Sequence, residues 1–172
     1  MDQLVEIKSK IQINPSRVGK KYFVKTFGCQ MNEHDSERIS GMFELDGMSK
    51  AISEEYADVL FVNTCTIREN ADDKLYGTLG QLKQWKSQKD NRKLLVGGCA
   101  AQKDKELVRE KAPWVDVVIG THNLTNVVDL LNRSEDWGPL TEIIDEIETL
   151  PTEAPSIRES EYSAWVTIQI GC

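Results

Sequence analysis

Three cysteines of this chain each follow an apolar run, and they recur at nearly even intervals. Cys29 ends the run YFVKTFGC, Cys65 ends VLFVNTC and Cys99 ends LLVGGC. The separations of 36 and 34 residues each match about one strand–helix unit of a parallel α/β sheet. Because the carboxyl ends of parallel strands meet at one edge, where open α/β folds bind ligands, we expect the three thiols to converge there. The pattern therefore predicts a metal site at this edge.

Two metal chemistries fit three cysteines, and a third interpretation needs no metal. A closed structural zinc site requires a fourth protein ligand, for which His34 and His122 are candidates, although neither lies at a CxxC or HxxxH spacing. An iron–sulfur cube requires thiolates without tight local spacing, and three cysteines would leave one iron open to a sulfur species or substrate. Alternatively, the cysteines are buried as small apolar side chains. Three cysteines at equivalent strand ends favour the metal site.

The residues beside the cysteines suit a ligand that the backbone approaches closely. Glycine precedes two of the cysteines, at Gly28 and Gly98, where it permits sharp turns and close contact. Polar side chains near the cysteines could donate hydrogen bonds to cluster sulfurs or to a bound ligand. These predicted donors are the side chains of Gln30, Asn32, Asn63 and Thr64.

Apolar periodicity places the cysteines on repeated strand–helix units. Continuous apolar runs predict strands buried on both faces, at 22–27, 59–62, 93–96 and 115–119. Helical spacing predicts the intervening helices, at about 35–45, 66–85, 104–110 and 124–131. Four such units with right-handed crossovers predict an α/β fold, a doubly wound parallel sheet of four to five strands with flanking helices.

Composition divides the chain into four parts. Residues 1–20 are polar and indicate an N-terminal tail, and residues 21–131 form the cysteine-bearing domain. Residues 132–163 are acidic, hold three prolines and indicate a linker with one short strand at 142–147. Residues 164–172 begin with a new strand, AWVTIQI. Because the chain stops directly after that strand, we expect a further domain that is cut off there.

The overall composition is that of an ordinary globular protein, with 172 residues of which 40% are hydrophobic and 28% charged. No window approaches the roughly 18 apolar residues of a membrane span, and the N-terminus lacks the pattern of a secretory signal. We therefore expect a cytoplasmic protein without membrane association, in a compartment where structural disulfides are rare. The four cysteines then indicate metal binding, reactivity or burial.

A net charge of −7 excludes a nucleic-acid footprint over the whole surface, but one basic group leaves a local footprint open. This basic group lies around Trp85 and Gln88, and its members are Lys83, Lys86, Lys89, Arg92 and Lys93. The alternative is a solvated helix face that runs into a loop, and the usual behaviour of charge runs favours it.

Separated blocks of the sequence resemble one known family, in order along the chain. They are KTFGCQMNEHDSERISGM (25–42), VLFVNTCTIRENADDK (59–74), LLVGGCAAQ (94–102) and WVDVVIGTHNL (114–124). These blocks are similar to the N-terminal domain of the methylthiotransferases, a branch of the radical S-adenosylmethionine enzymes. The resemblance covers residues 21–131 and resumes at 164–172. The TFGCQMN variant around Cys29 resembles the tRNA-modifying branch rather than the branch that acts on a ribosomal protein.

The resemblance implies a role for each cysteine. Cys29, Cys65 and Cys99 would bind an auxiliary [4Fe–4S] cluster whose open iron carries the sulfur to be inserted. Cys172 fits the first cysteine of the CxxxCxxC motif that holds the family's second cluster, after the first strand of a partial α/β barrel. Because the other two cysteines of that motif are absent, we expect this chain alone to bind no second cluster, to leave S-adenosylmethionine uncleaved and to be inactive.

In the whole enzyme, the resemblance implies methylthio transfer to C2 of an isopentenyl-modified adenosine next to the anticodon of tRNA. One S-adenosylmethionine would methylate sulfur on the auxiliary cluster, and a second would be cleaved with an electron donor to a radical that abstracts hydrogen from adenine. The target base lies in a single-stranded loop, where bases can be splayed out for recognition. We expect a monomer whose phosphate contacts come mostly from other parts of the protein, because this part is acidic.

Three rival interpretations stay open on the sequence. A ribosomal protein could be the substrate of the same chemistry, because the substrate is gripped outside this part of the enzyme. A non-catalytic α/β module could hold structural zinc or bury its cysteines. A flavodoxin-like nucleotide binder would share the predicted fold, but no GxGxxG or GxxxxGK[ST] follows the first strand.

Overall fold

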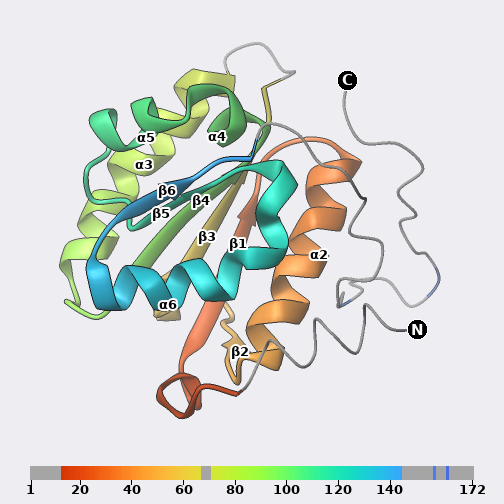
Figure 1. Ribbon diagram of the computed structural model, residues 1–172, viewed down its shortest axis with the longest axis vertical. Helices are drawn as coiled ribbons and strands as arrows, with labels where there is room; N and C mark the ends of the chain where they lie inside the picture. Colours follow the sequence, from red (N-terminus) through yellow and green to blue (C-terminus); the bar gives the residue numbers. More distant parts are fainter. Residues whose placement is uncertain (1–12, 67–70, 145–156, 158–161, 163–172) are drawn as a thin grey trace.

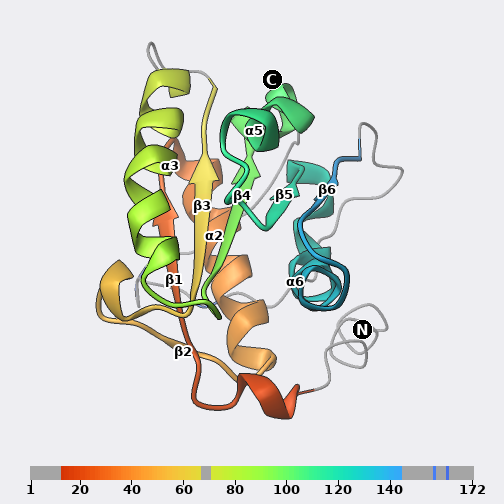
Figure 2. The ribbon, with the colours of Figure 1, turned by 90° about the vertical axis from the view of Figure 1, so that its left-hand side faces the viewer.

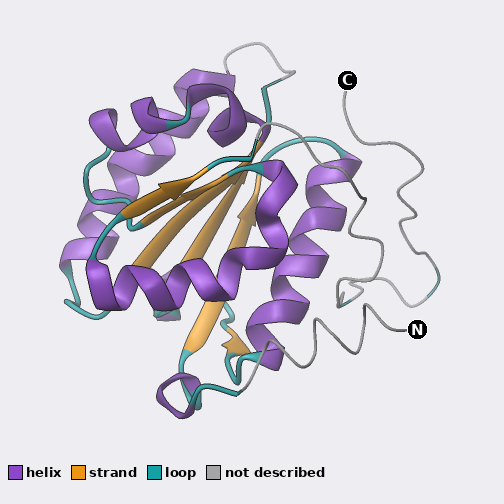
Figure 3. Ribbon diagram, in the orientation of Figure 1, coloured by secondary structure: helices purple, strands orange, loops and turns teal. Residues whose placement is uncertain are grey.

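The computed structural model describes residues 13–66, 71–144, 157 and 162, which form an open sheet with helices on both faces (Figures 1 and 3). The strands are β1 (Lys21–Thr26), β2 (Ser49–Lys50), β3 (Val59–Thr64), β4 (Lys93–Gly98), β5 (Val117–Ile119) and β6 (Leu140–Glu142). The α-helices are α2 (Gln30–Leu45), α3 (Ala71–Ser87), α4 (Cys99–Asp104), α5 (Glu106–Lys111) and α6 (Val127–Trp137). The short 3-10 helices are η1 (Pro15–Arg17), η2 (Glu54–Tyr56) and η3 (Thr121–Asn126).

The sheet is parallel throughout, with the strand order β2-β1-β3-β4-β5-β6. β2 therefore pairs with one side of β1, whereas β3 pairs with the other side. The chain reverses its direction across the sheet between these pairings, and such a reversal opens a crevice at the carboxyl ends of the strands. Cys29 follows β1 and Cys65 follows β3, so both lie at this reversal.

The strands form because their side chains are apolar towards both layers of helices. β3 is buried at every position, and its alternate residues face opposite layers. Leu60 and Val62 pack in the layer of α3, α4 and α5, whereas Val59 and Phe61 pack in the layer of α2 and α6 (Figure 2). The two layers together position the carboxyl ends of the central strands.

The doubly wound parallel sheet predicted from the sequence is confirmed, with six strands rather than four to five. The edge strand β2 was not predicted, and the other edge strand, β6, is displaced from its predicted position. With two and three residues, these strands are too short to carry a periodicity. β6 lies at 140–142 instead of beginning at 142. The helix predicted at 104–110 corresponds to α5. The unpredicted helix α4 precedes it, and the two meet at Lys105, which has a φ of 48°.

The last connection departs from the predicted right-handed crossovers. The steps from β3 to β4 and from β5 to β6 run the same way across the sheet, yet α3 and α6 cover opposite faces. The two connections therefore have opposite hand, which the general preference for one hand did not predict. Contacts of Glu142 hold β6 in place, because its carboxylate accepts from Arg133 at 2.7 Å and its backbone oxygen accepts from the Gly120 N–H at 3.1 Å.

Residues 13–20 pack against the domain, although their polar composition indicates a tail. Arg17 in η1 is fully buried, and its guanidinium donates to Glu135 at 2.7 Å and to Asn132 at 2.9 Å, both on α6. Its Nε lies 3.3 Å from Oδ2 of Asp46, which follows α2. Composition could not reveal this packing, because the partners of Arg17 lie far along the chain.

The region expected to be a linker also contributes to the fold. Residues 132–142 complete α6 and add β6 to the sheet. Three predicted features lie outside the described residues: the strand within 164–172, the cluster ligand Cys172 and residues 145–147 of the linker strand. Within the described ranges, no helix is long and apolar enough to cross a membrane.

The basic group around Trp85 makes its contacts inside the domain. Lys86 and Lys93 both pair with Asp116, and Arg92 is buried with its guanidinium 4.6 Å from the centre of the Trp85 ring. The other two members also have partners: Lys83 stacks on Trp114, and Lys89 lies 3.8 Å from Asp58. These contacts join α3 to the sheet, and they favour the structural interpretation of the basic group.

The buried carboxyl of Asp46 makes stability depend on pH. Burial raises the pKa of Asp46 to about 6, although the Arg17 guanidinium opposes this rise. Because the folded-state pKa lies above the ordinary value of 3.8, the fold favours the protonated carboxyl, and this contribution to stability is lost as pH rises through about 6. We expect the wild type to lose stability relative to Asp46→Asn over this range, as measured by urea unfolding at several pH values.

Asp90→Asn is the matched control, because Asp90 is exposed in a turn. Its stability relative to the wild type is expected to stay constant over the same pH range. A pH-independent difference between the wild type and Asp46→Asn would contradict the assignment.

Candidate metal centre

The structure places the three cysteines at the carboxyl ends of three adjacent strands. Cys29 is the N-cap of α2 after β1, Cys65 directly follows β3, and Cys99 opens α4 after β4. Adjacent parallel strands lie about 4.8 Å apart, so neighbouring strand ends carry one cysteine each at the same edge. Cys65 is buried, Cys29 and Cys99 are half-buried, and none of the three is in a disulfide. The structure therefore brings all three predicted residues to one edge.

Glycines let the three cysteine-bearing turns approach one another. A Cβ on Gly28 would lie 2.9 Å from the Cβ of Cys65, and a Cβ on Gly98 would lie 2.3 Å from the backbone oxygen of Thr64. The φ angles of 147° at Gly28 and 92° at Gly98 are ones that favour glycine. Residues 28 and 98 each stand one position before a cysteine, so these close contacts join the ends of β1, β3 and β4.

Two buried asparagines join the turn of Cys29 to the end of β3. Asn32, in the first turn of α2, is 1% exposed, and its Oδ1 accepts the backbone N–H of Cys29 at 3.2 Å. Its Nδ2 donates to Oδ1 of Asn63 and to the backbone oxygen of Thr64, both at 3.0 Å. In return, Nδ2 of Asn63 donates to the backbone oxygen of Asn32 at 2.7 Å. Each asparagine therefore binds the other's segment.

The same hydrogen bonds continue to the strand of the third cysteine. Oγ1 of Thr64 donates to the backbone oxygen of Gly97 at 2.6 Å, two residues before Cys99. On the α2 side, Nδ2 of Asn63 also donates to Oγ of Ser36 at 3.0 Å. We call this set, Asn32, Ser36, Asn63 and Thr64, the asparagine network. It connects the backbone next to all three cysteines.

Three of the four predicted hydrogen-bond donors are engaged by protein atoms. The amide nitrogens of Asn32 and Asn63 and the hydroxyl of Thr64 all donate within the asparagine network or to β4. They orient the cysteine-bearing turns, a role that depends on how α2 packs on β3 and that the sequence does not reveal. Gln30 is exposed at the start of α2 and stays a predicted donor.

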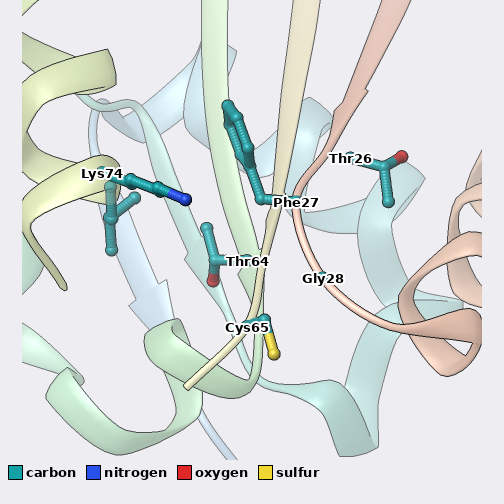
Figure 4. Close-up of a pocket in the computed structure, with 7 residues that line it drawn as sticks. Thr26, Phe27, Gly28, Thr64, Cys65 and Lys74 are labelled. Carbon is teal, nitrogen blue, oxygen red and sulfur yellow. The ribbon is translucent and has the colours of Figure 1, made fainter. Parts of the chain in front are cut away.

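A pocket of about 220 Å³ opens at the reversal between β1 and β3, beside Cys65 (Figure 4). Its lining residues are Thr26, Phe27, Gly28, Thr64, Cys65, Lys74 and Leu75. In Figure 4 the amine of Lys74 points from α3 towards Phe27 and Thr64. The sequence does not single out Lys74 as a pocket residue, because a lysine within the charged run ENADDK carries no distinguishing signal.

The two candidate histidines do not complete a site for a single ion with the cysteines. His34 is half-buried in α2, and burial is the largest cause that lowers its pKa, followed by the charge of Arg38. His122 lies in η3, and its buried Nδ1 has no hydrogen-bond partner among the described residues. In this part of the chain, no three side chains of His, Cys, Asp or Glu could hold one metal ion together. The structure therefore does not support the structural zinc site.

The fold and the position of the cysteines define a class of protein: a doubly wound α/β domain with three thiols on its ligand-binding edge. The model of a family described as "Uncharacterized protein family UPF0004" matches residues 21–120. The chain belongs to this family, and the matched region contains all three cysteines.

Relatives named tRNA-2-methylthio-N(6)-dimethylallyladenosine synthase match most of the chain. The relative from Tropheryma whipplei is 55% identical over 152 residues, which are 88% of this chain and 32% of the relative. The relative from Corynebacterium urealyticum is 48% identical over 167 residues, which are 96% of this chain and 31% of the relative. The chain spans about a third of the length of these curated relatives. The predicted resemblance to the N-terminal domain of the methylthiotransferases is confirmed.

Loss of the Asn63 side chain tests the asparagine network. Asn63→Ala removes three buried hydrogen bonds, two with Asn32 and one with Ser36, so we expect the free energy of unfolding to fall by about 3 kcal/mol in urea titrations. Asn126→Ala is the matched control, because that exposed amide makes one 3.4 Å contact and its loss is expected to cost less than about 0.5 kcal/mol. Equal losses in the two variants would contradict a special role for the network.

Two glycines with nearly the same backbone test the close approach at β4. Gly98 and Gly138 have φ angles of 92° and 88° with the same ψ of −170°, but a Cβ on Gly138 would meet nothing within 4 Å. Gly138→Ala is expected to lose about 1–3 kcal/mol of stability through backbone strain alone. Gly98→Ala adds overlap with Thr64 and is expected to lose roughly 2 kcal/mol more in the same assay. Similar losses would contradict the steric role of Gly98.

Proposed function

We propose that this chain is the auxiliary-cluster domain of a tRNA methylthiotransferase, with Cys29, Cys65 and Cys99 as the protein ligands of a [4Fe–4S] cluster. The observation that carries this proposal is the placement of one thiol at each of three adjacent parallel strand ends. The hydrogen bonds of the asparagine network, which join these ends, support it further. The name that the relatives share supports methylthio transfer as the reaction of the full-length protein.

The arrangement of the thiols favours a cube over a single ion. Tetrahedral zinc with bonds of about 2.3 Å brings its sulfur ligands to within roughly 3.8 Å of one another. No such group of three ligands occurs among the described residues. A cube accepts thiolates on three different irons, so it matches cysteines that are spread over three neighbouring strands.

The residues of this chain position the thiols and leave the edge accessible. The asparagine network holds the turns of Cys29 and Cys65 together, and Thr64 joins β3 to β4 before Cys99. The half-buried Cys29 and Cys99 flank the buried Cys65 at the middle strand, with Gln30 exposed at the rim. When bound, the cluster supplies an iron without a protein ligand, at which sulfur can be held.

The complete reaction belongs to the full-length protein, of which this chain corresponds to about a third. We infer that a radical S-adenosylmethionine domain follows from about residue 164, with Cys172 as the first ligand of its cluster. The inert C–H bond of the adenine ring requires a radical and therefore an electron donor, and the two domains hold sulfur and base close together. This chain alone is expected to be inactive.

Transfer RNA is the substrate that the relatives support, in preference to a ribosomal protein. Their shared name specifies a modified adenosine of tRNA. Because the basic group around Trp85 is engaged inside the domain, phosphate contacts are expected from other parts of the protein. Mass analysis of tRNA nucleosides after disruption of the gene tests this assignment, and undiminished methylthio-modified adenosine would contradict it.

Serine substitutions test the cluster ligands. Anaerobic reconstitution of the wild-type chain is expected to yield about four irons and a similar amount of acid-labile sulfide per chain. Replacement of Cys29, Cys65 or Cys99 by serine removes one of three ligands, so most of the iron is expected to be lost.

Cys172→Ser is the matched control for these variants and is expected to retain the iron. Iron loss confined to Cys172→Ser would reverse the assignment of the cysteines. Stoichiometric zinc without acid-labile sulfide would contradict the cluster assignment and would indicate a zinc site instead.

A further inference from the structure

Gln102 makes two hydrogen bonds that join the helix of Cys99 to the point where the chain leaves the sheet. It lies in α4, three residues after Cys99, which is nearly one helical turn. Its Oε1 accepts the backbone N–H of Thr121 at 3.1 Å, in the turn after β5. Its Nε2 donates to the backbone oxygen of Ile144 at 3.0 Å, two residues after β6. One side-chain amide therefore connects the segments that follow β4, β5 and β6.

Gly120, at the end of β5, leaves the space that this amide occupies. A Cβ on Gly120 would lie 2.2 Å from Oε1 of Gln102 and 3.0 Å from Oδ1 of Asn123. The φ of Gly120 is an ordinary −72°, so the close approach of Gln102 and not the backbone conformation requires a glycine here. The N–H of Gly120 also donates to the backbone oxygen of Glu142 at 3.1 Å. The turn after β5 thus accommodates Gln102 and holds β6 at the same time.

The helix α4 depends on such contacts for its position. It has six residues, which are too few for a helix to be stable without tertiary packing. Lys105 follows it with a φ of 48°, a conformation that costs a non-glycine residue energy. The hydroxyl of Tyr76 donates to Asp104 at 2.6 Å near the end of α4, and Gln102 supplies the bonds to the turns after β5 and β6. Because α4 begins at Cys99, these bonds also constrain Cys99.

The chain leaves the sheet at the edge that carries the cysteines. β6 is parallel to β5 and β4, so Ile144 lies beyond the same carboxyl edge as Cys99. Glu142 is fixed at the end of β6 by bonds from Asn123 and Arg133, and Gln102 adds a bond two residues further along. The polypeptide therefore continues from a point that is tied to the helix of Cys99.

We propose that Gln102 is a positioning residue, which sets the starting point of the following domain relative to Cys99. The inference rests on the proposed function, in which a second domain acts on sulfur held at the cysteine edge. A connection that is fixed at its first residues leaves fewer arrangements for the domain it carries, and this raises the effective concentration of that domain at the edge. Gln102 acts through Ile144 and α4, and no ligand role is assigned to it.

Nuclear magnetic resonance of the metal-free, reduced 172-residue chain tests the two hydrogen bonds separately. Gln102→Glu keeps an acceptor for the Thr121 N–H but places an oxygen against the backbone oxygen of Ile144. We expect unchanged hydrogen exchange at Thr121, whereas the backbone order parameter of Ile144 falls from about 0.85 to below about 0.6. In Gln102→Ala both bonds are lost, and exchange at Thr121 is expected to be about fivefold faster as well.

Gly120→Ala displaces the same amide without changing Gln102. The φ of −72° suits alanine, so the added methyl group acts mainly by its overlap with Oε1 of Gln102. We expect the same loss of order at Ile144. Gln81→Ala is the matched control, because Gln81 is exposed on α3 and its loss is expected to leave Thr121 and Ile144 unchanged.

A ratio measured in the full-length protein separates positioning from a merely structural role. The ratio is the amount of S-adenosylmethionine cleaved per methylthio-adenosine formed in tRNA. A less stable fold lowers both amounts together, whereas a poorly placed second domain cleaves S-adenosylmethionine without productive transfer. We expect the ratio to rise about fivefold in Gln102→Glu and in Gly120→Ala, the effect of one weak hydrogen bond, and to stay at the wild-type value in Gln81→Ala.

The failure of this inference is distinguishable from the failure of the proposed function. An unchanged ratio in Gln102→Glu, or an Ile144 that stays ordered in that variant, would overturn the positioning role and leave the proposed function intact. A full-length wild type that forms no methylthio-adenosine would overturn the proposed function, and this inference with it.

Discussion

The reciprocal hydrogen bonds between Asn32 and Asn63 are the constraint on which the cysteine edge depends. Both amides are buried, and each donates to the other's segment, so a shift of α2 along β3 would leave several polar groups without partners. An unsatisfied buried group costs about 1–3 kcal/mol, whereas apolar packing tolerates small displacements more readily. The distance between the turns of Cys29 and Cys65 is therefore set by directional bonds.

The parallel sheet supplies the other half of this constraint. Asn63 pairs with Thr26 on one side, and Thr64 pairs with Gly98 on the other, so three strands end at nearly the same level. Layers of helices on both faces bury these strands and prevent slippage, because a slip of one residue would turn apolar side chains to the wrong layer. A polar site at the edge can then be built from short turns alone.

The sequence predicted those features that repeat along the chain or that one residue type determines. The apolar runs before Cys29, Cys65 and Cys99 indicated buried parallel strands, and the structure contains them. The sequence did not predict that Asn32 and Asn63 bind each other, because reciprocal pairing depends on the tertiary contact of α2 with β3. The edge strands, the opposite hand of the last crossover and the pocket position of Lys74 likewise depend on packing between distant segments.

The anchoring of Arg17 bears on how this domain can be produced as a separate unit. The window that the family model matches begins at residue 21 and ends at residue 120, so it omits both η1 and α6. A recombinant piece cut to that window would leave Asp46 without its cationic neighbour. It would also uncover the apolar face of β4 and β5 that Val127 and Leu131 protect, which invites aggregation. A recombinant piece that includes residues 13–144 keeps η1 and α6, and therefore keeps the cationic neighbour of Asp46 and the cover over β4 and β5.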